Sequence, residues 1–370
     1  MSSRLLAAWQ RRGPLAALLW PVSRVYAALL GLRRLAYRIG LARSERLPVP
    51  VLVVGNVVVG GAGKTPTVIA LLRHLRTRGW TPGVISRGYG RQGDSCLEVT
   101  AASSSSEAGD EPLLIARASG APMVVGRRRA EAGRLLLTRH PEVDIVVCDD
   151  GMQHWALARD LTVVVFDERG SGNGWLLPAG MLREPWPALP WGGGDSLDEL
   201  LVLRTARKGM ALPPLRPAMA GGAIHMARRE LSSHAIAADG SQQALSQLAQ
   251  QPGGLAALAG IAQPQRFFEM LAARGLSLQQ ALELPDHADG PTMLAAMLAT
   301  AQAAQRPGLV WLCTEKDAVK LWPLLESHPG IELWAVPLEQ TPEPSFWDEL
   351  DQALKRLRER LSSRHGRQTP

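Results

Sequence analysis

Cysteine is scarce in this 370-residue chain, which contains three. Cys96, Cys148 and Cys313 are scattered and odd in number, which excludes a disulfide-stapled scaffold and predicts free thiols in a reducing compartment. Charged residues make up only 20% of the chain against 46% hydrophobic residues, so wholesale disorder is excluded and a large core can form. The chain is too long for one small domain and suits two α/β lobes.

No uninterrupted apolar run reaches the ~20 residues that a bilayer span requires. The apolar stretches near the N-terminus, residues 15–20 and 25–32, are short, and Pro21 between them is expected to break a helix. Arginines continue through this region and no small-residue cleavage site follows it, which argues against a cleavable signal peptide.

The net charge of +7 belongs to the N-terminus. Residues 1–46 contain nine arginines and one glutamate and therefore carry +8, which leaves −1 on the rest of the chain. A nearly neutral body argues against a nucleic-acid-binding protein, whereas a basic arm suits an anionic surface. In a helical projection Leu18, Val25 and Leu29 share one face, and Arg34 lies opposite. Two interpretations remain open: a helix that packs on the protein's own core, and one that lies on a membrane.

Beyond the arm, apolar runs alternate with helical patterns. Residues 49–54 form a nearly continuous apolar run, as in a strand that is buried on both faces, and residues 65–78 follow as a helix. Further apolar runs end in polar turns at residues 82–86, 143–148 and 162–166. This alternation predicts a doubly wound, mostly parallel α/β sheet.

A glycine-rich turn between the first predicted strand and helix is the strongest functional signal. The loop residues are Val58, Val59, Gly60, Gly61, Ala62, Gly63, Lys64, Thr65 and Pro66. Glycines let backbone N–H groups wrap around phosphates at a helix N-terminus, Lys64 would reach the β- and γ-phosphates, and the Thr65 hydroxyl would bind Mg²⁺. The usual spacing of such a loop is not met, because Val58 occupies the first glycine position, and an ordinary glycine-rich turn is the alternative interpretation.

Two acidic pairs follow predicted strands and are candidates for the metal site. Asp149 and Asp150 end the run 143–148 and precede Gly-Met-Gln-His, whereas Asp167 and Glu168 end the run 162–166. We favour Asp149 and Asp150 because they belong to the denser set of polar residues, and an acid at a strand end is often only a helix cap.

These motifs together resemble the tetraacyldisaccharide 4′-kinase family, over most of the chain and in one order. The matching segments are Gly-Asn at 55–56, Gly60–Pro66, the Ser-Arg-Gly-Tyr-Gly-Arg run 86–91, Gly-Asp-Glu-Pro at 109–112, Asp-Asp-Gly-Met-Gln-His at 149–154, Gly-Asn-Gly at 172–174, Leu-Leu-Pro-Ala-Gly at 176–180, Leu-Arg-Glu-Pro at 182–185, Gly-Ile-Ala-x-Pro-x-Arg-Phe-Phe at 260–268, Asp-His at 286–287, and Thr-Glu-Lys-Asp-Ala-Val-Lys at 314–320. The displaced first glycine also fits this family. Met152 departs from the aromatic residue that is usual there, and Ala288 from a second histidine.

The resemblance implies a lipid A pathway kinase with ATP and Mg²⁺ as cofactors. Its substrate would be a glycolipid, a tetraacylated glucosamine disaccharide 1-phosphate that is phosphorylated on its 4′-hydroxyl. Such an enzyme works peripherally at the cytoplasmic face of the inner membrane of Gram-negative bacteria, and because its substrate stays in the bilayer, the membrane interpretation of the arm is favoured. We expect neither a nucleic acid nor an obligate protein partner.

The resemblance also implies roles for individual residues. Asp110 would accept the proton of the sugar hydroxyl, oriented by His287, although Asp110 also suits a helix N-cap. Arg183 would join Lys64 in neutralising charge on the transferred phosphoryl group. Gln153 would position phosphate, and Glu184 would be a further acid near the metal.

With the resemblance, the chain is expected to form a P-loop NTPase-like sheet and a second, smaller α/β domain. We expect a basic amphipathic segment over 1–46, a P-loop kinase domain over 47–195, a linker over 196–250, where glycine, proline and glutamine accumulate, and a C-terminal α/β domain with a closing helix over 251–370.

Other classes of nucleotide-binding protein remain as alternatives. An ATPase that switches partners would carry a signature lysine where this chain has Val59. A GTPase would need Asn-Lys-x-Asp, but the lysine of the run 314–317 stands one place late. A kinase for a soluble sugar would leave the basic arm without a purpose.

Overall fold

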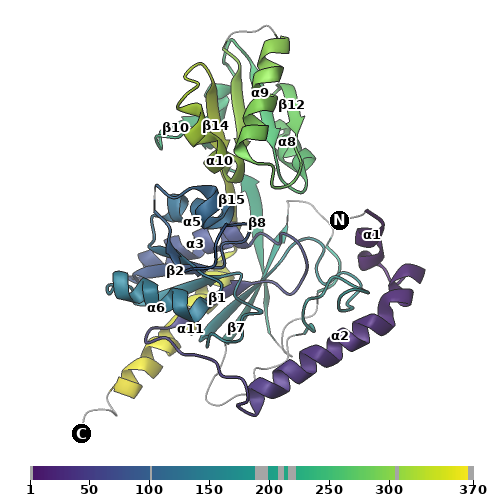
Figure 1. Cartoon of the computed structure of the whole chain (residues 1–370), viewed down its shortest axis with the longest axis vertical. Coiled ribbons are helices and arrows are strands. Elements are labelled where there is room, and N and C mark those ends of the chain that lie inside the picture. Colours follow the sequence, from purple (N-terminus) through teal and green to yellow (C-terminus); the bar gives the residue numbers. More distant parts are fainter. Residues whose placement is uncertain are drawn as a thin grey trace.

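The computed structural model describes residues 3–100, 102–187, 199–206, 212–215, 222–304 and 308–365. A larger lobe, with the N-terminal helices at its side, lies below a smaller one (Figure 1). The helices are α1 (Ser3–Gln10), α2 (Pro14–Arg38), α3 (Lys64–Thr77), α4 (Ser105–Ala108), α5 (Asp110–Ser119), α6 (Arg129–Arg139), α7 (Leu245–Leu248), α8 (Pro264–Ala273), α9 (Gly290–Ala304), α10 (Glu315–Leu325) and α11 (Pro344–His365). The strands are β1 (Val51–Gly55), β2 (Pro82–Ser86), β3 (Leu97–Glu98), β4 (Met123–Val125), β5 (Ile145–Asp149), β6 (Leu161–Phe166), β7 (Glu199–Ala206), β8 (Ile224–Leu231), β9 (His234–Ile236), β10 (Gln242–Ala244), β11 (Leu255–Ala259), β12 (Leu278–Glu283), β13 (Val310–Thr314), β14 (Glu332–Val336) and β15 (Leu338–Pro342).

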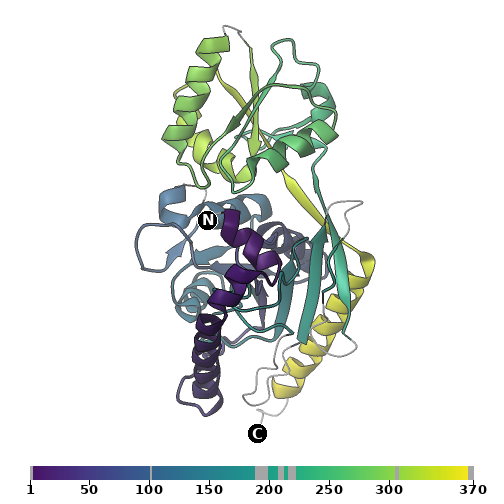
Figure 2. The same ribbon diagram turned by 90° about the vertical axis from the view of Figure 1, so that its right-hand side faces the viewer.

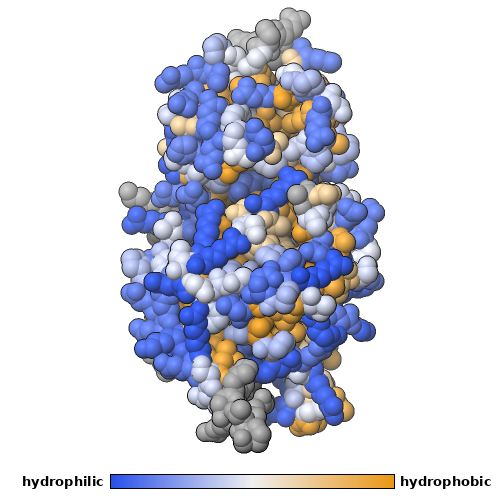
Figure 3. Space-filling view, turned by 90° about the vertical axis from the view of Figure 1, so that its left-hand side faces the viewer, coloured by the Kyte–Doolittle hydropathy of each residue, from blue (hydrophilic) through white to orange (hydrophobic). Residues whose placement is uncertain are grey.

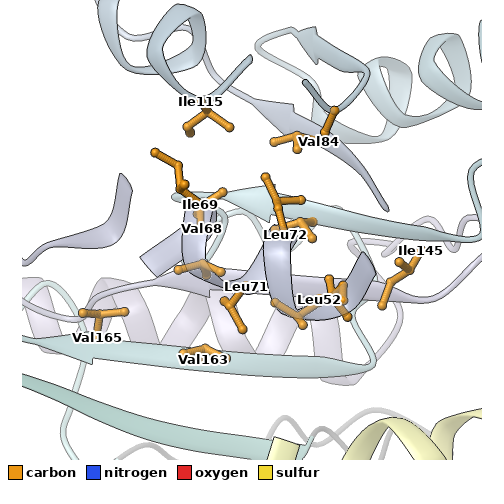
Figure 4. Close-up of a cluster of buried hydrophobic side chains, with 14 of the residues drawn as sticks. Leu52, Val68, Ile69, Leu71, Leu72, Val84, Ile115, Ile145, Val163 and Val165 are labelled. Atoms are coloured by element: carbon orange, nitrogen blue, oxygen red, sulfur yellow. The ribbon is translucent and has the colours of Figure 1, made fainter. Parts of the chain in front are cut away.

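A nine-stranded sheet forms the larger lobe, in the order β15-β8-β7-β6-β1-β5-β2-β4-β3. The strands from β8 to β4 run parallel, and the two edge strands pair antiparallel to their neighbours. All five residues of β1 are buried, as expected for a parallel strand covered on both faces. Leu71 and Leu72 of α3 pack against this sheet with Leu52 and Val163 (Figure 4). The predicted doubly wound sheet is confirmed.

A six-stranded sheet forms the smaller lobe, in the order β10-β9-β14-β13-β11-β12. Its four strands from β14 to β12 are parallel. One hydrophobic cluster contains Phe267 and Phe268 of α8, and another contains Met293 of α9 and Leu321 of α10. The second, smaller α/β unit is thus present, with its own core.

The chain crosses between the lobes more than once, which sequence reasoning missed. Strands β7 and β8 lie within the segment 196–250, expected to be a linker, yet both pair in the large sheet. After the smaller lobe, β15 pairs with β8, and α11 packs against β7 and β8 (Figure 2). These strands were not recognised in the sequence because glycine and proline surround them, as in a linker. Composition also does not reveal which distant strand a short apolar run pairs with. The glycines at 192–194 lie outside the described residues.

Helix α2 is a single 25-residue helix that continues through Pro21, so the expected break is wrong. A proline inside a helix removes one backbone hydrogen bond. Two hydrogen bonds C-terminal to Pro21 hold the helix on the larger lobe. Ser23 Oγ donates to the Leu176 carbonyl at 2.9 Å, and Tyr26 Oη donates to the Arg183 carbonyl at 2.9 Å. By length and composition α2 could cross a bilayer. Only 11% of its most apolar 18-residue stretch is buried inside the protein.

Candidate active site

The glycine-rich loop joins the carboxyl end of β1 to α3, the strand–turn–helix arrangement that a phosphate-binding loop requires. Gly63 takes a left-handed conformation (φ +84°) immediately before Lys64 begins the helix, which favours glycine there. Inside the loop, Asn56 donates from Nδ2 to the Gly60 carbonyl at 3.2 Å, and Thr67 donates from Oγ1 to the Gly63 carbonyl at 2.8 Å. The loop is therefore held by its own polar groups.

The first two residues of the predicted phosphate loop contact the segment at residues 181–182 within the protein. Val58 is fully buried and forms a β-bridge with Leu182. The N–H of Val59 donates to the Met181 carbonyl at 2.9 Å. Because this donor is used within the protein, the binding surface for phosphates is expected to begin at Gly60.

Asp150 lies opposite the loop lysine at the carboxyl end of β5. Its Oδ1 is 3.7 Å from Lys64 Nζ and 3.4 Å from Arg183 Nη2. Asp150 has φ +46°, a region that costs energy for any residue except glycine and that persists where the surrounding structure imposes it. The structure thus brings the predicted lysine, arginine and carboxylate together.

Asp149 is buried and suits a metal ligand. Ser86 Oγ donates to its Oδ2 at 3.0 Å, whereas its Oδ1 is buried and has no hydrogen-bond partner among the residues that the structure describes. Burial first, and then the negative charges of Glu111 and Asp150, raise the pKa of Asp149 to about 7, while Lys64 opposes the shift. A buried carboxylate oxygen beside a second carboxylate is chemically suited to a divalent ion, because the ion neutralises the repulsion between the acids, so the residues fit the expected Mg²⁺.

No group of three or more His, Cys, Asp and Glu side chains suited to a metal occurs in the part of the chain that the structure describes. A Mg²⁺ site commonly uses one or two carboxylates together with substrate phosphates and water. Glu184, the other acid expected near the metal, contacts Arg34 at 3.8 Å and Gln153. Burial raises the pKa of Glu184.

Asn56 joins the other predicted nucleotide-site residues, and sequence reasoning assigned it no role. Gln153 Nε2 donates to its carbonyl at 3.1 Å, and Arg183 donates both to this carbonyl, at 2.9 Å, and to its side-chain oxygen. Asn56 is fully buried. The sequence signal for Asn56 was a polar residue directly after an apolar strand. When such a side chain is buried, it must have hydrogen-bond partners.

Asp110 begins α5 and faces the smaller lobe. Its Oδ2 is 3.7 Å from His287 Nδ1, as expected from the sequence, and 3.0 Å from Lys320 Nζ, which sequence reasoning did not assign. Gly109, directly before α5, packs against Gly88 just beyond the carboxyl end of β2, and β2 runs parallel to β5. The start of α5 thus lies at the same edge of the sheet as the end of β5. The lobe contact therefore adjoins the phosphate-loop site.

The alternative acidic pair is held by arginines. Asp167 Oδ2 forms an ion pair with Arg169 at 2.8 Å. Glu168 is paired with Arg266 of α8 and lies 3.8 Å from Arg229 of β8. Through Arg266, Glu168 connects the larger lobe to the smaller one. Since arginines already pair with both acids, Asp149 and Asp150 remain the favoured candidates for the metal.

We expect the imidazole of His154 to make the stability of the folded protein depend on pH below 6.5. Burial, followed by the charges of Arg129 and Arg159, lowers the pKa of His154 from 6.5 to about 4, and its Nε2 lies 3.3 Å from the Arg129 backbone nitrogen. Between these two pH values the unfolded chain binds a proton that the folded protein does not, so the free energy of unfolding falls as the pH falls through this window. We expect His154→Gln to remove part of this loss, on the order of 2 kcal/mol since the ring is only partly buried.

Urea unfolding at a series of pH values measures this effect. The same change at the exposed His234 is the control. If the free energy of unfolding of His154→Gln depended on pH as it does in the wild-type protein, this would contradict a partly buried imidazole that stays neutral in the folded protein.

Comparison with known proteins identifies the family of this chain. A profile of the LpxK family, described as tetraacyldisaccharide-1-P 4′-kinase, matches residues 15–355. The chain is 52% identical over 369 residues to the tetraacyldisaccharide 4′-kinase of Polaromonas naphthalenivorans (strain CJ2), with 100% of both chains covered. It is 54% identical over 361 residues to the enzyme of that name from Acidovorax sp. (strain JS42), with 96% of each covered.

A solved structure of LpxK from Aquifex aeolicus, in complex with ATP, superposes on this fold with a TM-score of 0.72. The two sequences are 26% identical, and the match covers 92% of this chain and 99% of the other. With a family profile that spans most of the chain and relatives that are half identical over their full length, the chain belongs to the tetraacyldisaccharide-1-P 4′-kinase family.

Proposed function

We propose that this protein transfers the γ-phosphate of ATP to the 4′-hydroxyl of a tetraacylated glucosamine disaccharide 1-phosphate. The observation that carries the proposal is that three groups lie at one edge of the large sheet: the phosphate loop with Lys64 after β1, the acids after β5, and, beyond the end of β2, Asp110 with its partners from the smaller lobe. The family relationship supports both the donor and the class of acceptor.

Each of these residues would have a distinct role in phosphoryl transfer. Backbone N–H groups from Gly60 onward and the Lys64 ammonium would bind the β- and γ-phosphates, and Arg183 would stabilise the negative charge of the transferred group. The 4′-oxygen attacks the γ-phosphorus, the bond from phosphorus to the β,γ-bridging oxygen breaks, and ADP leaves. Asp110 accepts the hydroxyl proton, with His287 orienting its carboxylate.

Mg²⁺ fits this arrangement. Asp149 and Asp150 would hold the ion with the Thr65 hydroxyl, and Glu184 would orient this region through Gln153. When bound, the ion neutralises phosphate charge and fixes the phosphates for in-line attack.

Incubation of the full-length protein with γ-labelled ATP and the glycolipid in detergent micelles tests the proposal. We expect the label to appear in the lipid and to be lost when EDTA removes the metal. Label released only as inorganic phosphate would support an ATPase switch instead. Transfer to a soluble disaccharide with equal efficiency would support a soluble-sugar kinase.

We further propose that α2 holds the enzyme peripherally on the cytoplasmic face of the inner membrane. The large apolar side chains that α2 and the following turn expose are Leu15, Leu18, Trp20, Val22, Val25, Leu29, Leu32, Leu35, Ile39 and Leu41. The helix lies on the side of the molecule (Figure 1) opposite the face shown in Figure 3, where hydrophilic side chains predominate between separate apolar areas. Arginines beside an apolar face suit anionic headgroups, and basic residues near such a surface contribute about 1 kcal/mol each.

We likewise propose a functional division of the chain: residues 1–46 for the membrane, 47–195 for ATP, and the part of 251–370 before β15 for closing the site over the substrate, because β15 and α11 belong to the larger lobe. Strands β7 and β8 within 196–250 connect the last two parts through the large sheet. Tyr26 and Arg34 link α2 to Arg183 and Glu184, which would align the nucleotide site with the membrane.

Glutamate at Leu18, Val25 and Leu29 is expected to abolish binding to vesicles of phosphatidylglycerol and phosphatidylethanolamine. These side chains are 75%, 62% and 59% exposed, so the substitutions should leave the melting temperature unchanged while placing charge on the apolar face. Flotation of the full chain with vesicles measures binding.

The control adds the same three charges to exposed positions of α11, at Gln352, Ser362 and Ser363. It should bind vesicles like the wild-type protein. Equal loss of binding in both variants would point to general charge repulsion, and retained binding in the α2 variant would contradict an α2 anchor.

A further inference from the structure

We propose that Lys320 of α10 is a positioning residue for the catalytic base, holding the Asp110 carboxylate in place across the two lobes. The inference rests on the proposed function, since it takes Asp110 as the base. Lys320 belongs to the Thr-Glu-Lys-Asp-Ala-Val-Lys run 314–320, a motif for which neither the fold nor the reaction has yet supplied a purpose.

The geometry of the ammonium group is the first argument. Lys320 Nζ lies 3.0 Å from Asp110 Oδ2 and donates to the Ala288 carbonyl at 3.0 Å. Its side chain is only 4% exposed. A buried lysine is costly unless it is paired and hydrogen-bonded, so this one is fixed to the base and to the loop that follows His287.

Both partners of Asp110 approach the same oxygen. His287 Nδ1 is 3.7 Å from Oδ2, the atom that also contacts Lys320. Among the described residues, the ion pairs of Asp110 thus fall on Oδ2, which would leave Oδ1 to accept the substrate hydroxyl. A base must lie within hydrogen-bond reach of the proton it takes, and two contacts on one oxygen define where the other one points.

The rest of the motif builds the support for these contacts. Thr314 caps α10, and the buried Asp317 accepts hydrogen bonds from Thr314 Oγ1 at 2.7 Å and from the Gly260 N–H at 3.1 Å. The Gly260 carbonyl in turn accepts the N–H of His287 at 3.1 Å, where the histidine has φ +62°. One end of the motif therefore fixes His287 through Gly260, and the other end fixes Asp110 through Lys320.

The same helix face provides a matched control. Lys316 lies one turn before Lys320 and also reaches α5, with Nζ 3.5 Å from Glu111 Oε1. Its carboxylate partner is 44% exposed, against 17% for Asp110. An exposed pair contributes little, so Lys316→Met removes a contact between the same two helices without touching the base.

Lys320→Met is expected to lower kcat about 100-fold, the cost of a misplaced reacting group, with KM for ATP unchanged. Lys320→Arg, which keeps the charge, should recover part of the loss, and Lys316→Met should keep the wild-type kcat. Melting temperatures and nucleotide binding of each full-length variant show whether it is folded. Transfer of label from ATP to the glycolipid in micelles is the assay.

A double-mutant cycle separates positioning from general support. If Lys320 acts through Asp110, adding Lys320→Met to Asp110→Asn should lower kcat no further than Asp110→Asn alone. A wild-type kcat in Lys320→Met would overturn the inference, and so would an equal further loss in the double variant. A wild-type rate in Asp110→Asn, or unlabelled lipid with the wild-type protein, would instead overturn the proposed function.

Discussion

Replacing Lys64 with methionine is expected to lower the rate of phosphoryl transfer by about 10²- to 10³-fold, the effect of removing one preorganised charge from a developing anion. Methionine keeps the length and apolar stem of lysine but has no ammonium group. Lys64 is the loop residue at which α3 begins, and its Nζ lies 3.7 Å from Oδ1 of Asp150. The lysine is therefore already directed to the edge of the sheet where phosphates would lie.

Steady-state kinetics of label transfer to the glycolipid measure this loss. Because the Lys64 ammonium would contact phosphate both before and during transfer, we expect KM for ATP to rise as well as kcat to fall. Lys355→Met, at an exposed position of α11, is the matched control and should have wild-type kinetics. Unchanged turnover in Lys64→Met would contradict the phosphate-loop interpretation.

Asp110→Asn is expected to lower kcat by about 10²- to 10⁴-fold, the range of general base catalysis. Asparagine has nearly the same shape but cannot take the hydroxyl proton. The affinity for ATP should be unchanged, because the described ion pairs of Asp110 run to His287 and Lys320 of the smaller lobe and not to the phosphate loop. Loss of transfer with retained nucleotide binding is thus the signature of this base.

Titration with a fluorescent ATP analogue and the label-transfer assay test both halves of this expectation. Asp348→Asn, at an exposed position near the start of α11, controls for the loss of one negative charge. The melting temperature of Asp110→Asn is also informative, since the buried Lys320 ammonium loses its partner, which destabilises a fold. A fully active variant would show that the base lies elsewhere.

Local chemistry explains why much of the site could be predicted. The phosphate loop is contiguous, and its glycines, lysine and threonine are required at fixed positions between a strand and a helix. Asp149 and Asp150 were predictable because the carboxyl ends of parallel strands meet at one edge of a sheet. The family resemblance added Asp110 and His287, whose types and spacing alone would not have joined them.

Residues that lie far apart in the chain account for what sequence reasoning missed. Asn56 became recognisable as the partner of Gln153 and Arg183 only when the loops after β1 and β5 were side by side. Val59 belonged to the phosphate loop by position, yet its N–H is used by Met181. In each case the partner is more than 90 residues away, and local patterns carry no information about it.

By itself the sequence determined the α/β class, the phosphate loop and the basic, apolar arm, because each depends on residues that are neighbours along the chain. Tertiary structure alone decided that β7, β8 and β15 complete the large sheet, that α2 runs unbroken through Pro21, and that Lys320 reaches Asp110. The physical reason is that strand pairing, helix packing and buried ion pairs depend on which distant surfaces exclude water together.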